Sequence, residues 1–158
     1  MIHHKRQLRE RNKVSSVDRL NMSDEIRING VRFTLGDLFN VVDDFYARVQ
    51  VDPILKVPFH SVHDWPDHIQ RITHFWWIRF GGKPYLFAEY NPVLKHFFAG
   101  FNTVFLTQWL KLFHETLREH LNEEQSNLWK VISERMGHSL SIKNDYFKEH
   151  YEINKNQS

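Results

Sequence analysis

The sequence contains no cysteine and few residues that interrupt helices. Without cysteine, the chain has no disulfide, zinc–thiolate site or iron–sulfur cluster available to it. Six glycines and five prolines occur among 158 residues, and no apolar run approaches the roughly 18 residues expected of a membrane-spanning helix. The N-terminus is charged and no apolar stretch follows it, so we expect no secretory signal. These absences predict a soluble, cytoplasmic protein without a membrane span.

Charge is distributed unevenly along the chain. Residues 1–23 hold six lysines and arginines against two acidic residues, a net charge of +4, whereas the remaining residues hold 15 basic and 17 acidic side chains. The body therefore lacks the basic surface of a nucleic-acid-binding protein, and we expect no nucleic-acid partner. We interpret residues 1–23 as a basic, flexible extension, residues 24–153 as one domain and residues 154–158 as a C-terminal tail.

Helix signals recur through the rest of the sequence. Apolar residues at helical spacing, with capping residues before them and proline, glycine or a further cap after them, predict five helices. Residues 26–33 are expected to be an irregular lead, and no alternating strand pattern competes with the helices. The predicted fold class is therefore all-α. The helices are expected at residues 34–52, 64–80, 91–100, 102–121 and 122–151.

The shortest of these helices, residues 91–100, carries a candidate metal ligand. It has asparagine as a cap, proline at its first helical position and glycine at its end. About two turns of helix are not stable alone in water. Something else must hold the segment, and a metal–ligand bond through His96 is one candidate. A half-exposed histidine on a surface helix is an equal alternative from the pattern alone.

Four motifs, taken in order, give the chain a family resemblance. They are Phe45-Tyr46 with Asp52-Pro53 and Phe59; Trp65-Pro-Asp-His68 with Phe75-Trp76; Tyr90-Asn-Pro-Val-Leu-Lys-His96; and Phe105-Leu-Thr-Gln-Trp109-Leu-Lys-Leu-Phe113. From about Leu35 to Tyr151 the chain resembles the group III truncated haemoglobins. The resemblance implies a truncated globin domain, a two-over-two helical sandwich that encloses haem b.

The resemblance also implies roles for four polar side chains. His96 is the implied proximal ligand of the haem iron, and Tyr46 and Trp109 are implied hydrogen-bond donors to a bound gas. Dioxygen on ferrous iron carries partial negative charge, so each donor is worth roughly 1.5–3 kcal/mol in a dry site. The alternative is that Tyr46 and Trp109 only pack the core. His68 resembles the distal histidine, and three roles stay open for it: bonding to the ligand, swinging outward as a gate, or binding the iron.

Apolar walls and two cations complete the implied haem site. Arg71 and Lys95 are long enough to reach the haem propionates, although a solvated charge is an equal alternative for each. The other histidines show no metal-ligand spacing, and we interpret them as surface or packing residues. The implied haem-contacting residues are Phe45, Phe59, His68, Arg71, Ile72, Phe75, Trp76, Lys95, His96 and Trp109.

The implied function is binding of dioxygen, nitric oxide and other diatomic ligands at a histidine-ligated haem iron. Two hydrogen-bond donors slow the release of oxygen, which argues against simple oxygen delivery. Nitric-oxide dioxygenation and redox chemistry on peroxide or sulfide are the implied enzyme activities, with an unidentified reductase as a partner. Two alternatives stay open, a gas or redox sensor module and a haem-free helical interaction protein.

Overall fold

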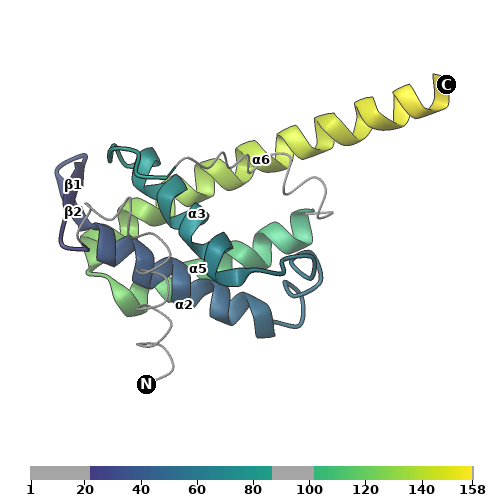
Figure 1. Ribbon diagram of the computed structural model, residues 1–158. Helices are drawn as coiled ribbons and strands as arrows, with labels where there is room; N and C mark the ends of the chain where they lie inside the picture. Colours follow the sequence, from purple (N-terminus) through teal and green to yellow (C-terminus); the bar gives the residue numbers. More distant parts are fainter. Residues whose placement is uncertain (1–21, 87–101, 158) are drawn as a thin grey trace.

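A computed structural model describes residues 22–86 and 102–157, which are mainly helical (Figure 1). The helix α2 packs against α3 and α5, and α5 packs against α6. The helices α2 and α3 thus form one pair and α5 and α6 the other, which agrees with the predicted helical sandwich. The elements are β1 (Glu25–Ile28), β2 (Val31–Thr34), α2 (Leu35–Val51), α3 (Trp65–Arg79), α5 (Thr103–His120) and α6 (Glu123–Gln157).

Capping side chains set the starts of the helices, as the sequence predicts. The Thr34 hydroxyl accepts the backbone N–H of Asp37 at 3.0 Å, and the Asp37 carboxylate accepts the backbone N–H of Thr34 at 2.9 Å. Asn122 and Gln125 make the same reciprocal pair before α6. These contacts satisfy backbone N–H groups that a helix leaves without partners at its first turn.

The last helix is longer than its sequence predicts. Helix α6 continues beyond Tyr151 to Gln157, so residues 154–157, expected as a tail, are helical. Its C-terminal part extends away from the other elements (Figure 1). In the described part of the chain, no helix combines the length and apolar character needed to cross a membrane.

The residues before α2 form a hairpin, where an irregular lead was expected. Strands β1 and β2 pair antiparallel, with Ile26 opposite Phe33. Asn29 and Gly30 connect them with φ values of 51° and 80°, the left-handed conformation that a tight two-residue hairpin turn requires. The prediction for residues 26–33 is therefore wrong. The Asn-Gly pair between alternating apolar residues is the signal that was overlooked.

A cluster of five aromatic rings joins the hairpin to three helices. Its centre is Trp129 of α6, which is fully buried. The ring centroids of the other four members lie 5.3–6.0 Å from that of Trp129. We call this set the core cluster. Burial of large apolar rings such as these contributes strongly to the stability of the fold. Its members are Trp129, Phe33, Trp76, Phe80 and Phe113.

Candidate functional site

Tyr46 of α2 and Trp109 of α5 contact the same ring, that of Phe45. The Phe45 ring centroid lies 4.8 Å from the centroid of Tyr46 and 5.0 Å from that of Trp109. Tyr46 is 4% exposed and Trp109 is 9% exposed. Packing of α2 on α5 therefore brings together two of the predicted site residues, which are far apart in the sequence, in a region with little access to water.

The indole N–H of Trp109 is buried and finds no hydrogen-bond acceptor among the described residues. A buried donor without an acceptor is destabilising by about 1–3 kcal/mol, so such groups call for an explanation. Trp129 has an N–H in the same condition, but it lies within the core cluster. Trp109 also stacks on Phe113 of the core cluster, at a centroid distance of 4.8 Å, but on its other side it contacts Phe45, whose ring packs on Tyr46. This donor fits a site that receives a small acceptor ligand.

His68 of α3 lies beside Tyr46 in a second group of rings. The ring centroids of His68 and Tyr46 are 5.9 Å apart, with the rings nearly perpendicular. The side chain is half-buried, and its Nε2 atom is not accessible to solvent. The rings of Phe59 and Trp65 also pack on Tyr46, each with a centroid distance of 5.8 Å. We call Tyr46, Phe59, Trp65 and His68 the pocket cluster, after the distal pocket that the family resemblance predicts.

Two other predicted wall residues lie in different surroundings. Ile72 is buried one turn after His68, on the same side of α3. Trp76 belongs to the core cluster, where its ring stacks on Phe113 at a centroid distance of 6.1 Å. Phe75 is half-buried and contacts Trp76. The structure thus places Ile72 next to the pocket cluster and Trp76 in the core, and contact of either with a haem stays a prediction.

The structure describes one of the two predicted cations, and it does not describe the predicted iron ligand. Arg71 is exposed and makes an ion pair with Asp67, one turn earlier on α3, at 2.8 Å. Lys95 and His96 lie outside the described residues. Among the residues that are described, no group of three or more potential ligands gathers to hold a metal ion. A propionate contact for Arg71 or Lys95, and iron ligation by His96, stay predictions.

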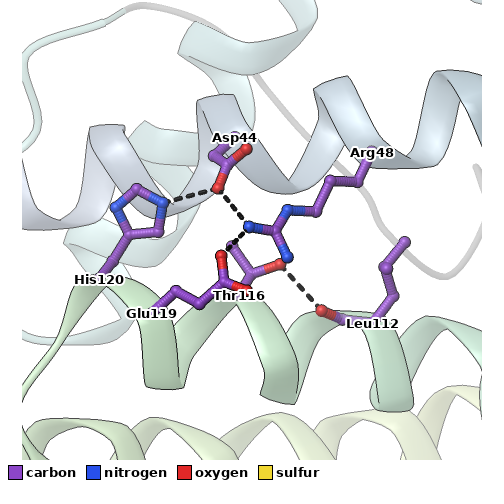
Figure 2. A network of polar contacts seen from close by, with 6 residues as sticks. All are labelled: Asp44, Arg48, Leu112, Thr116, Glu119 and His120. Atoms are coloured by element: carbon purple, nitrogen blue, oxygen red, sulfur yellow. Dashed lines mark hydrogen bonds and ion pairs between the residues drawn. The ribbon is translucent and has the colours of Figure 1, made fainter.

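A polar network joins α2 to α5 (Figure 2). Its two α2 members, Asp44 and Arg48, precede and follow Tyr46 in the sequence. Arg48 makes ion pairs with Asp44 of its own helix, at 2.9 Å, and with Glu119 of α5. The Nε2 atom of His120 lies 2.7 Å from the Asp44 carboxylate. Because Asp44 and Arg48 flank Tyr46, these contacts help to fix Tyr46 relative to α5, the helix that carries Trp109. Sequence reasoning missed this network, because no local sequence pattern predicts contacts between residues of α2 and residues of α5.

The network also sets the charge state of its acids. Burial raises the pKa of Asp44, but hydrogen bonds from His120 and Arg48 outweigh it and leave that pKa below its ordinary value. The hydrogen bond from Arg48 lowers the pKa of Glu119 as well. Both carboxylates therefore stay ionised at neutral pH, and the pairs persist there.

His74 of α3 is a buried packing residue with a defined contact. Its Nε2 atom accepts the backbone N–H groups of Tyr85 at 3.1 Å and of Leu86 at 3.3 Å. Burial lowers the pKa of His74, which keeps that nitrogen unprotonated and able to accept. The prediction that His74 is a surface or packing residue leaves this role out. The partners are backbone groups beyond the end of α3, so no side-chain pattern reveals them.

The chain is similar to known proteins in sequence and in fold. Residues 35–140 match the family described as bacterial-like globin. The group 3 truncated hemoglobin ctb of Campylobacter jejuni is 31% identical over 96 residues, which are 56% of this chain and 72% of that protein. A crystal structure of group III truncated hemoglobin from Campylobacter jejuni has a TM-score of 0.59 at 22% identity, and the match covers 69% of this chain and 89% of that one. The family match includes Tyr46, His68 and Trp109.

Proposed function

The chain belongs to the bacterial-like globin family, and from that membership we propose that it binds haem b and a diatomic gas such as dioxygen. When bound, the haem supplies an iron at which a small ligand is held. We assign the iron ligand to His96, within the matched residues 35–140. The observation that carries the proposal is the buried indole N–H of Trp109, which lacks an acceptor in the described part and lies in the ring group that contains Tyr46.

Tyr46 and Trp109 are the proposed donors to the ligand. Both are buried, so water competes poorly for their O–H and N–H groups. A donor to a partly charged acceptor contributes roughly 1.5–3 kcal/mol, and two donors slow ligand release by orders of magnitude. His68 is the proposed third polar residue of this pocket. Phe45, Phe59, Ile72, Phe75 and Trp76 are the proposed apolar walls, and Arg71 and Lys95 are the proposed propionate partners.

Slow release favours chemistry on oxygen over its delivery. We propose nitric-oxide dioxygenation as the first reaction to test, because it requires oxygen to be retained until nitric oxide arrives. The reaction combines nitric oxide, dioxygen and one electron into nitrate, so it needs a separate reductase as the electron source. Peroxide or sulfide turnover at the same pocket is the second activity to assay. A sensor role would leave the protein inactive in both assays while gas binding persists.

Replacement of the proposed iron ligand tests the function. His96→Gly is expected to abolish stable haem retention, and added imidazole is expected to restore part of it, since the free ring can occupy the vacated position. His63→Gly is the matched control, because His63 is exposed in the loop before α3. The measurement is the Soret absorbance that remains after gel filtration. Equal haem retention by the His96→Gly protein and the wild type would overturn the assignment.

A further inference from the structure

Trp65 contacts every other member of the pocket cluster. Its ring centroid lies 5.4 Å from that of His68 with the rings perpendicular, 5.8 Å from Tyr46 and 6.4 Å from Phe59. Trp65 and His68 are three residues apart on α3 and therefore share one face of that helix. A rotation of the His68 side chain away from Tyr46 must therefore displace the indole or pass around it.

Trp65 is also an outer member of the cluster. Tyr46 is buried, whereas Trp65 and Phe59 are half-buried and pack on it. The rings of Trp65 and Phe59 thus cover Tyr46 on the side where they meet solvent. His68 packs on the same Tyr46 ring, so movement of His68 out of this group would expose Tyr46.

The start of α3 fixes the position of Trp65. Asp64 caps the helix by accepting the backbone N–H of Asp67 at 3.2 Å, and Pro66 restricts the backbone of the first turn. The first helical hydrogen bond joins the His68 N–H to the Asp64 carbonyl at 3.0 Å. The backbone of Trp65 is therefore rigid, and its ring packs on those of Tyr46, Phe59 and His68.

We propose that Trp65 is a positioning residue that holds His68 against Tyr46 and thereby limits the rate at which a diatomic ligand enters the pocket. This inference rests on the proposed haem-based function. Trp65 acts through His68, so its effect on entry depends on the imidazole being present. The Trp65 ring itself does not contact the ligand.

Carbon monoxide association after flash photolysis of the haem-loaded protein tests the inference. Trp65→Leu, which keeps apolar bulk without a flat ring, is expected to raise the association rate constant at least about tenfold, because His68 is no longer held inward. Trp65→Phe retains a ring against His68 and is expected to stay within about threefold of the wild type. Trp77→Phe is the control on the same helix, since Trp77 bonds to the Lys83 carbonyl instead of packing in the cluster.

A double variant separates positioning from simple obstruction. In a His68→Ala background, Trp65→Leu is expected to leave the association rate unchanged, because the residue through which it acts is gone. An equal rise in both backgrounds would overturn the inference, as would no rise in either. If Trp65→Leu shows a normal Soret band and an unaltered association rate, the inference is overturned and the proposed function stands. Absence of any Soret band would instead overturn the proposed function, and the inference with it.

Discussion

The core cluster and the pocket cluster are built from similar ring contacts but differ in exposure and polarity. Centroid distances to Trp129 in the core cluster are 5.3–6.0 Å, and those within the pocket cluster are 5.4–6.4 Å. All five core rings are buried, whereas Phe59, Trp65 and His68 are half-buried. The pocket cluster also contains a hydroxyl and an imidazole. The two clusters therefore differ in exposure and in polar groups, and not in the geometry of their ring contacts.

Truncation in the core cluster is expected to have the largest effect. Trp129→Ala removes a fully buried ring that contacts four others, and is expected to lower the free energy of unfolding by about 3–5 kcal/mol. Urea denaturation monitored by circular dichroism measures this loss. Trp65→Ala in the pocket cluster is the matched comparison and is expected to lose less, because Trp65 is only half-buried. Equal losses would show that the two clusters do not differ in their contribution to stability.

Removal of one hydroxyl from the pocket cluster is expected to change ligand release more than stability. Tyr46→Phe keeps the ring and its contacts but removes the donor, so oxygen dissociation is expected to accelerate at least about tenfold, equivalent to ~1.4 kcal/mol. Stopped-flow displacement of oxygen by carbon monoxide measures the rate. Phe33→Leu in the core cluster is the control, because Phe33 packs on Phe80 and Trp129, and it is expected to change stability but not release. An unaltered rate in Tyr46→Phe would place the hydroxyl outside the ligand site.

The smallest expected effect is a dependence of stability on pH. Burial lowers the pKa of His74 from 6.5, so the unfolded chain binds more protons than the folded one as the pH falls below 6.5. The free energy of unfolding is therefore expected to fall as the pH decreases below 6.5. Above pH 6.5, His74 is expected to add no pH dependence.

A non-titrating replacement isolates the contribution of His74. His74→Gln offers an amide oxygen to the N–H groups of Tyr85 and Leu86 and is expected to flatten the pH dependence in part. His114, whose pKa burial also lowers, and the carboxylates of lowered pKa, such as Asp44, are expected to contribute to the remaining slope. Denaturation midpoints measured at several pH values in both proteins give the difference. Identical slopes would show that His74 does not titrate differently on folding.

Local signals were enough to predict the starts of the four helices that the structure describes, whereas the helix predicted at residues 91–100 lies outside the described residues. Thr34, Asp64, Asn102 and Asn122 are all polar residues of the types that cap helices, and each lies at the start of a helix. The glycine at 81 adopts a φ of 96° just after α3 ends. Caps and glycine act over one turn of chain, so their effect can be read from the sequence.

Contacts between distant residues could not be predicted in the same way. Helical spacing places Trp76 on an apolar face, but a core residue and a haem-contacting residue give the same pattern. The pairing of Arg48 with Glu119 depends on how α2 crosses α5, which no local pattern specifies. The association of Phe45, Tyr46 and Trp109 was anticipated through family resemblance and not through periodicity. The Asn29-Gly30 turn, by contrast, was visible in the sequence and was overlooked.

The visible absorption spectrum of the purified protein reconstituted with haem tests the central claim most directly. We predict an intense Soret band in the ferrous form that shifts when carbon monoxide is added, and that remains with the protein through gel filtration. A folded, helical protein that emerges colourless, with all the haem left in the small-molecule fraction, would contradict the account.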